Sequence, residues 1–148
     1  MTLTYEDARV ALETISSELK RRALPSVITV ADDHGELIAL MRMDGAPLSS
    51  IVIASNKAWT AARLQKPSAE IGRASRQPDT GFDIAYYGDP RYVGWGGGVP
   101  VVIDGVVVGA VAVSGAPQAV DMELAALGAA AIVRGRAMGA EPGATPPL

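Results

Sequence analysis

Apolar residues near the start of the chain recur every three or four positions, which is the spacing of one face of a helix. The stripe consists of Tyr5, Ala8, Leu12, Ile15 and Leu19. Thr4 can cap this helix, because Asp7 follows three residues later as a variant of the capping box. Basic residues gather at its end, where cations suit the helix dipole, and Pro25 comes next. The pattern predicts a helix from about Tyr5 to Arg22.

Two pairs of β-branched runs predict two hairpins. Residues 27–31 and 37–41 flank a polar turn that ends in glycine, and residues 99–103 and 106–113 flank Asp104-Gly105. An Asp-Gly step between such runs is the strongest short-range signal of a hairpin. Strands joined in this way lie antiparallel, so we expect an antiparallel sheet.

Further apolar patterns predict two more long helices. One begins at Ser49 or Ser50 and runs to about Gln65, and a short helical turn can start at Ser68. The other, from about Ala119 to Met138, is rich in alanine on all sides, which is typical of a helix buried all round. In a chain of this length we expect another subunit to cover one side of it, and therefore a homo-oligomer.

The order of elements is helix, hairpin, helix, loop, hairpin, helix, which predicts an α+β fold with helices packed on the sheet. The 148 residues suit one domain, at 1–138, with a Pro- and Gly-rich tail at 139–148. The first residues lack the basic start and apolar run of a signal peptide, and no apolar stretch is long enough to cross a bilayer. We therefore expect a cytoplasmic protein outside the membrane.

Composition excludes several classes of site. The chain has no cysteine, so disulfides, thiolate zinc sites and cysteine nucleophiles are excluded. Its single histidine, His34, excludes any site that needs two imidazoles from one chain. Asp32, Asp33 and Glu36 flank it in a predicted turn, but their spacing matches no metal motif, so we expect no metal. The net charge of −3 offers no general footprint for nucleic acid.

Residues 73–95 are polar and irregular, yet they hold five of the seven aromatic side chains of the chain. The five are Phe82, Tyr86, Tyr87, Tyr92 and Trp95. A long irregular segment in a compact domain is usually functional when it is ordered. Either the rings plug the edge of the core or an interface, or the segment covers a binding site as a lid.

Three consecutive glycines, Gly96, Gly97 and Gly98, precede the second hairpin and suggest a close approach of the backbone to another group. No Gly-Lys-Ser/Thr follows them, and a strand rather than a helix comes next, so the run is neither a P-loop nor a dinucleotide fingerprint. Its amides could form an anion-binding nest. Alternatively, the run is a bulged entry into the strand.

Lys57 lies on or beside the apolar stripe of the second long helix. A lysine there either extends its ammonium to water or finds a carboxylate or a ligand. Asn56 beside it supplies both a donor and an acceptor. We place a pocket where these two residues face the three glycines, beneath the segment 82–95. The alternative is that Lys57 pairs with Asp44 or Asp121 and only stabilises the fold.

Several of these motifs occur together in one known family. The matching strings are 30–46, Ala54–Ala61 with its Asn-Lys-Ala and following aromatic, 96–100 with Asp104-Gly105, and then Gly109, Ser114-Gly115 and Asp121. In this order they resemble the GlcG/HbpS-like family, which includes the C-terminal domain of PduO, from about Thr4 to Met138. The resemblance implies a profilin-like three-layer α/β/α sandwich with a five-stranded antiparallel sheet, and homo-oligomers.

Members of this family are often described as haem-binding or haem-degrading, so the resemblance makes haem a candidate cofactor. In haem-binding members of the PduO type, a histidine from the early part of the chain ligates the iron, and the first predicted helix here has none. We therefore expect haem, if it binds, to bind weakly and without ligation by His34. Tyr86, Tyr87 and Met41 are other candidate axial donors.

Three functions remain open: an oligomer that binds haem or another small organic ligand, a cofactor-independent enzyme, and a structural subunit without a ligand. The enzyme would be an isomerase or lyase acting on a small carboxylate or carbonyl compound, with the glycine amides polarising an oxyanion. The candidate ligand-binding residues are Arg42, Asn56, Lys57, Trp95, Gly96, Gly97, Gly98 and Ser114. The candidate catalytic residues are Lys57, Asp44 and Asp121, the two carboxylates serving to move a proton.

Overall fold

The two predicted hairpins form the central sheet of the computed structural model, which describes residues 1–139. The first hairpin comprises β1 (Val27–Asp32) and β2 (Leu37–Arg42), and the second comprises β3 (Gly98–Ile103) and β4 (Val106–Ser114). The strand order is β2-β1-β4-β3 with antiparallel neighbours, so β1 and β4 are central. The predicted tail lies outside the described residues from position 140 onward.

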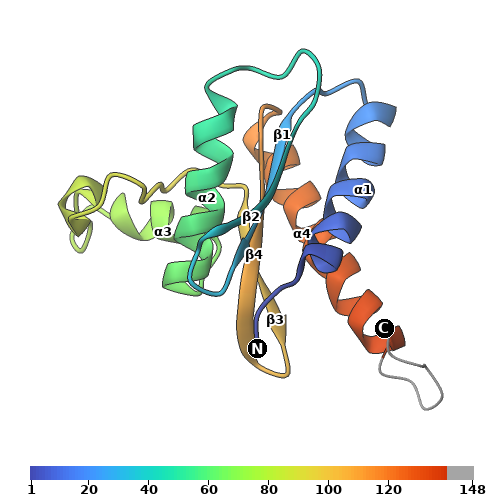
Figure 1. Ribbon diagram of the computed structural model, residues 1–148. Coiled ribbons are helices and arrows are strands. Elements are labelled where there is room, and N and C mark those ends of the chain that lie inside the picture. The colour runs from blue at the N-terminus through green and yellow to red at the C-terminus, as the bar shows by residue number, and fades with distance from the viewer. Residues whose placement is uncertain (140–148) are drawn as a thin grey trace.

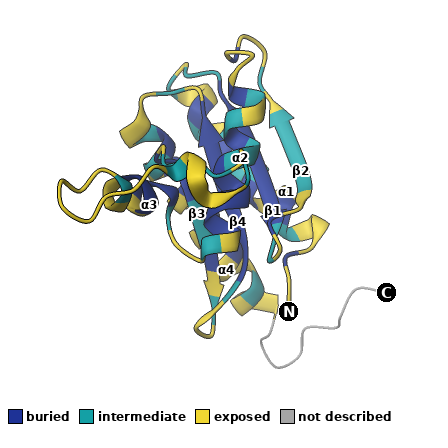
Figure 2. Ribbon diagram, turned by 90° about the vertical axis from the view of Figure 1, so that its left-hand side faces the viewer, coloured by how far each residue is buried: buried dark blue, intermediate teal, exposed yellow. Residues whose placement is uncertain are grey.

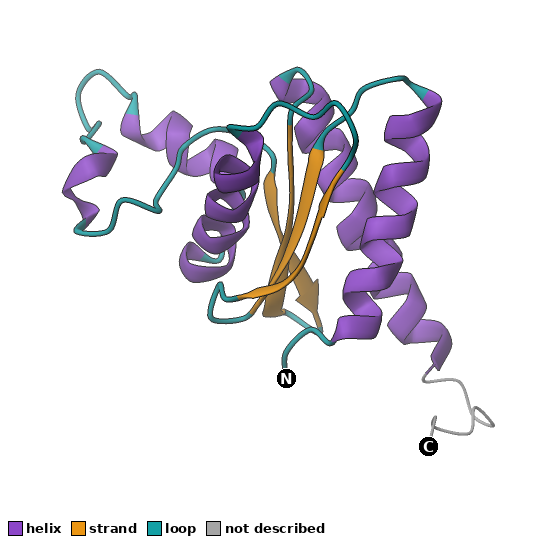
Figure 3. Ribbon diagram, turned by 45° about the horizontal axis from the view of Figure 1, so that its top comes forward, coloured by secondary structure: helices purple, strands orange, loops and turns teal. Residues whose placement is uncertain are grey.

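Helices cover both faces of the sheet and give three layers (Figures 1 and 3). α1 (Tyr5–Arg21) and α4 (Gln118–Gly139) lie side by side on one face, and α2 (Ser50–Leu64) lies on the other. α3 (Ser68–Ser75) and a 3-10 helix (Ile84–Tyr87) follow in a segment that extends away from the sheet (Figure 1). The predicted α+β fold is confirmed.

The prediction of five strands is wrong, because the described residues contain a sheet of four. The longest segment between two neighbouring helices or strands of 1–139 that contains no strand of its own runs from α3 to β3. It contains Pro78, Gly81, Gly88 and Pro90, and it forms turns and the 3-10 helix instead. Proline cannot donate to a strand ladder and glycine weakens one, so this segment is poorly suited to pairing.

The predicted capping box at the start of α1 is present. The Thr4 hydroxyl accepts a hydrogen bond from the Asp7 amide at 3.2 Å, and the Asp7 carboxylate accepts one from the Thr4 amide at 2.7 Å. This reciprocal pair satisfies two backbone donors at the helix end. It explains why α1 begins at Tyr5, as the sequence predicts.

The two faces of the sheet are packed differently. Large aliphatic side chains fill the space between the sheet and α1 and α4, among them Ile15, Leu19, Ile28, Val111 and Leu124. The space between the sheet and α2 is lined instead by small side chains, namely Ala31, Ala58, Ala61, Ala62, Ala110 and Ala112. Small residues on both sides let α2 approach the sheet closely, which brings its polar residues near the end of β4.

α4 buries one face and exposes the other in the single chain. Leu124, Ala125, Gly128 and Ile132 are buried against the sheet and α1, whereas Leu127 and Val133 are exposed. Figure 2 shows the same contrast in the whole molecule, with buried strands at its centre and exposed residues on the outer helices. Burial of α4 on all sides therefore requires a second subunit and stays a prediction.

Within residues 1–139, no helix combines the length and the hydropathy needed to span a bilayer.

Candidate functional site

Lys57 is buried, with only 2% of its side chain exposed. It points from α2 towards the end of β4, where its Nζ donates hydrogen bonds to the Val113 carbonyl at 2.9 Å and to Asp121 Oδ2 at 3.1 Å. The interpretation that its ammonium reaches water is therefore wrong. Of the two candidate carboxylates, Asp121 is the partner and Asp44 is not.

Asp121 lies in the first turn of α4, and its side chain is 4% exposed. Its second oxygen, Oδ1, accepts a hydrogen bond from the Ala116 amide at 3.1 Å. Burial raises the pKa of Asp121, while the charge and hydrogen bond of Lys57 oppose that shift. Burial likewise lowers the pKa of Lys57, against the attraction of Asp121. The pair joins the helix layers on opposite faces of the sheet.

The three glycines lie against Lys57, and Gly97 makes room for its ammonium. Gly97 has φ +129°, and a Cβ atom there would lie 2.8 Å from Lys57 Nζ and 2.6 Å from the Val113 oxygen. The Gly98 amide donates to Ser68 Oγ at 2.9 Å, and the Gly96 amide donates to Gln118 Oε1 at 3.4 Å. Because these two amides have side-chain partners, the run serves close packing rather than an open nest of amides.

A cavity of about 330 Å³ opens beside the ion pair, and we call it the lysine cavity. Its polar and aromatic lining comprises Ser50, Lys57, Trp95, Ser114, Gln118 and Asp121. The Ser114 hydroxyl donates to the Ser50 hydroxyl at 3.2 Å, and both are buried. Trp95 is 55% exposed, and the centroid of its ring lies 5.9 Å from Lys57 Nζ. The cavity thus has a charged floor and an aromatic rim.

Three of the sequence-predicted site residues lie elsewhere. Asn56 lines a separate small pocket with Trp59 and Arg91, because successive residues on a helix point about 100° apart. Arg42 and Asp44 line a third cavity at the end of β2. The structure therefore brings Lys57 together with Asp121, Trp95, Ser114 and the glycines, and leaves Asn56, Arg42 and Asp44 outside. Ser50 and Gln118 were missed as site residues in the sequence analysis. They are the first residues of α2 and α4, and Gln118 directly follows Pro117.

The aromatic segment does not form a lid over the lysine cavity. Its rings pack in a chain in which Phe82 stacks on Tyr87 at 5.2 Å, Tyr87 meets Tyr92 at 4.9 Å, and Tyr92 meets Trp59 at 4.6 Å. Only Trp95, at the end of the segment, lines the cavity. The alternative is that the rings fill the edge of the core. Tyr92 fits this alternative best, because it packs against Trp59 of α2.

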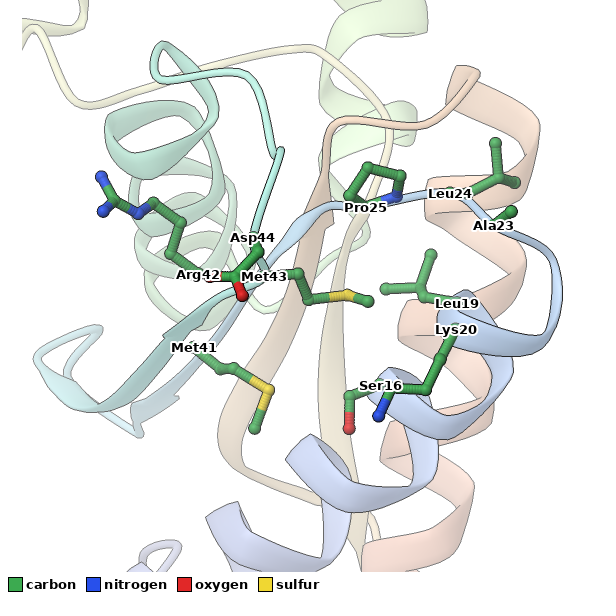
Figure 4. Close-up of a pocket in the computed structure, with 10 residues that line it drawn as sticks. All are labelled: Ser16, Leu19, Lys20, Ala23, Leu24, Pro25, Met41, Arg42, Met43 and Asp44. Carbon is green, nitrogen blue, oxygen red and sulfur yellow. The ribbon is translucent and has the colours of Figure 1, made fainter.

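A larger cavity of about 630 Å³ lies where the end of α1 meets the end of β2, and we call it the methionine cavity (Figure 4). Met41 and Met43 alternate along the chain and point their thioethers into it, opposite Leu19 and Ser16, while Arg42 points away (Figure 4). Lys20 and Asp44 contribute charged groups to its lining. This cavity was not predicted from the sequence; two methionines at alternate positions, Met41 and Met43, are the signal that could have indicated it.

His34 lies in the turn between β1 and β2, away from both cavities, with 75% of its side chain exposed. Ligand atoms of Asp32, Asp33 and His34 come within 4.8 Å of one another. Oδ1 of Asp32 already accepts the amides of His34 and Glu36, as expected for a turn. The cluster is therefore explained by turn geometry.

Comparison with known proteins identifies close relatives of this fold and sequence. The Escherichia coli K12 protein GlcG is 38% identical over 112 residues, which are 76% of this chain and 81% of that protein. An uncharacterized 15.0 kDa protein from the dhaT-dhaS intergenic region of Citrobacter freundii is 33% identical over 124 residues, or 84% of this chain and 87% of that protein.

Solved structures with similar sequences also share the fold of this chain. The Klebsiella pneumoniae protein ORFY superimposes with a TM-score of 0.83 at 31% identity, over 89% of this chain and 91% of that one. The PduOC:heme complex superimposes with a TM-score of 0.82 at 26% identity, over 88% of this chain and 95% of that one. The profile of the family described as "Haem degrading protein HbpS-like" matches residues 3–130. The predicted resemblance is confirmed, and the chain belongs to the HbpS-like family.

Proposed function

We propose that the protein binds a small organic ligand in the lysine cavity and does so as a homo-oligomer. The observation that carries the proposal is that a buried Lys57–Asp121 pair opens onto a cavity instead of being sealed in the core. Burying two charges costs several kcal/mol of desolvation free energy per ion. A pair that served only to stabilise the fold would gain little over apolar side chains, so we infer that this pair has a role in binding. A cavity of this size also falls within the range of about 300–1,000 Å³ that is common for ligand pockets.

The small molecules that co-purify with the protein provide the test. Wild-type protein is desalted, and its bound molecules are identified by native mass spectrometry alongside the double variant Lys57→Met/Asp121→Asn, which neutralises both charges. Lys66→Met is the matched control, because Lys66 is an exposed lysine just beyond α2. We expect a molecule in the wild type and the control that is absent from the double variant. A molecule retained by the double variant would place the ligand elsewhere.

If the protein is instead a cofactor-independent enzyme, its active site would be the same cavity, with two of the three predicted catalytic residues. Asp44 lies at the methionine cavity, so Asp121 and Lys57 are left to move a proton. Burial lowers the pKa of Lys57, which favours its neutral, proton-accepting form. Turnover of a small carbonyl compound that is lost in the double variant would favour this alternative over simple binding.

Haem is a second candidate ligand, and the methionine cavity is the site that suits it. The haem complex of PduOC, a structural neighbour, motivates the candidate. The cavity offers apolar walls, the thioethers of Met41 and Met43 as iron donors, and Lys20 for a propionate. Bound haem would supply an iron centre for electron or oxygen chemistry.

Haem titration of three proteins tests this assignment. We expect a Soret band that persists in His34→Ala and changes in Met41→Leu/Met43→Leu, since sulfur rather than imidazole would ligate the iron. An imidazole-type spectrum that vanishes in His34→Ala would contradict it.

A further inference from the structure

We infer that the lysine cavity selects small carboxylate anions, whose carboxylate accepts a hydrogen bond from Lys57 Nζ. This inference rests on the proposed function, because it names the chemical class of ligand for the same cavity.

The first argument is an unused donor. A lysine ammonium carries three protons. Among the described residues Lys57 Nζ has two acceptors, the Val113 carbonyl at 2.9 Å and Asp121 Oδ2 at 3.1 Å. The third proton remains for a ligand, and the side chain that carries it lines the cavity. A carboxylate binds a buried ammonium more strongly than a neutral acceptor does, because both partners are charged.

The second argument is the balance of charge around the cavity. Lys57 and Asp121 cancel each other, so the remaining field comes from the backbone. The first turns of two long helices border the cavity: Ser50 and Ile53 belong to α2, and Gln118 and Asp121 belong to α4. The start of a helix carries a partial positive charge. Two such ends that border one cavity favour an anion over a cationic ligand.

The third argument limits the size and charge of the anion. The Asp121 carboxylate lies 3.1 Å from the Lys57 ammonium. It therefore repels a ligand with two negative charges more strongly than a ligand with one. A monoanion is therefore preferred to a dianion such as phosphate. The cavity of about 330 Å³, with the Ser50 and Ser114 hydroxyls in its wall and Trp95 at its rim, suits a short-chain acid. The Ser50 and Ser114 hydroxyls lie 3.2 Å apart, and both line the cavity, where hydroxyl groups can bind a ligand oxygen.

The experiment compares acids with their uncharged amides. Propionate and propionamide are nearly identical in shape and differ in charge, and inorganic phosphate supplies a dianion. Each is titrated into the ¹⁵N-labelled protein, and the amide shifts of residues 96–98 and 115–121 are followed by NMR. We expect saturable shifts with propionate, at least tenfold weaker binding of propionamide, and weaker binding of phosphate than of propionate.

Variants then assign the preference to the ion pair. Lys57→Met/Asp121→Asn should lose the difference between acid and amide, whereas Lys66→Met should keep it. Propionamide binding as tightly as propionate, phosphate binding more tightly than propionate, or no saturable shift with the acid would each overturn the inference. The wild-type comparison alone decides the matter if the double variant does not fold. A neutral molecule that co-purifies in the lysine cavity would overturn the inference and leave the proposed function standing.

Discussion

Burial of the Lys57–Asp121 pair has a cost in lost hydration and a gain in hydrogen bonds to the backbone. Each ion loses hydration on burial, which costs several kcal/mol. Each gains a backbone partner in return, the Val113 carbonyl for the ammonium and the Ala116 amide for the carboxylate. The pair is therefore balanced only while both members are present.

Replacing one member should destabilise the protein more than replacing both. In Lys57→Met, the Asp121 charge is left buried without a counter-ion, and we expect the free energy of unfolding to fall by about 3 kcal/mol or more. In Lys57→Met/Asp121→Asn, no charge remains, and most of that loss should be recovered. Chemical denaturation of the two variants measures both values. If Lys57→Met were as stable as the double variant, leaving Asp121 without its counter-ion would cost nothing, and the expectation would be wrong.

Gly97 and Gly105 illustrate two reasons why a position requires glycine: a positive φ angle, and a lack of space for a side chain. Both have positive φ, +129° and +78°, but a Cβ on Gly97 would crowd Lys57 Nζ and the Val113 oxygen, whereas nothing lies within 4 Å of one on Gly105. Gly105→Ala should therefore cost about 1–2 kcal/mol of backbone strain alone. Gly97→Ala should cost clearly more in the same denaturation assay. Equal costs would mean that the ammonium moves aside freely.

At the scale of helices and strands, prediction succeeded where the signal is local. The stripe and capping box of α1 and the Asp-Gly turn before β4 depend on residues a few positions apart, and both were predicted correctly. The partner of Lys57 is 64 residues away, and the sequence left Asp44 and Asp121 as equal candidates. Asn56 lines a different pocket from Lys57 because successive residues on α2 point in different directions. Such choices depend on how the layers pack, which no local pattern records.

The contact between α1 and α4 should weaken in acid. Arg136 near the end of α4 donates to both carboxylate oxygens of Asp7, at 3.1 and 2.6 Å. Burial alone would raise the pKa of Asp7, but the hydrogen bonds from Arg136 and Thr4 outweigh it and hold that pKa below its ordinary value of 3.8. A depressed carboxyl pKa contributes stability above the ordinary value, and this stability is lost as pH falls through the lower, folded-state value.

Arg136→Met tests this contact. We expect the variant to be less stable than the wild type at neutral pH, and the difference to shrink as pH falls below 3.8, where Asp7 becomes protonated in both proteins. Urea denaturation at several pH values gives the difference directly. A gap that stayed constant with pH would show that Arg136 stabilises the helices by packing rather than by charge.

In the whole molecule, the lysine cavity and the methionine cavity lie at the same end of the sheet. Val27, at the start of β1, pairs with Arg42 on one side and with Ser114 on the other. Pro25 lines the methionine cavity, and its carbonyl lies 3.2 Å from the position of a Cβ on Gly115, which lines the lysine cavity. The segment before β1 thus separates the two cavities. His34 and the Asp104-Gly105 turn lie at the opposite end, which agrees with the absence of imidazole from both linings.

The exposed face of α4 is the surface that we expect a second copy to cover. Leu127 and Val133 are 37% and 38% exposed, and the exposed Ala130 lies between them in the sequence. Sedimentation should therefore give a mass above the 15.3 kDa of one chain. Ala130→Glu should return the protein to a monomer, because a charge on this face would be buried without a partner. Ala74→Glu, on the exposed side of α3, is the control and should leave the assembly intact. A wild type that sediments as a monomer at micromolar concentration would refute the homo-oligomer and leave the apolar face of α4 open to another partner.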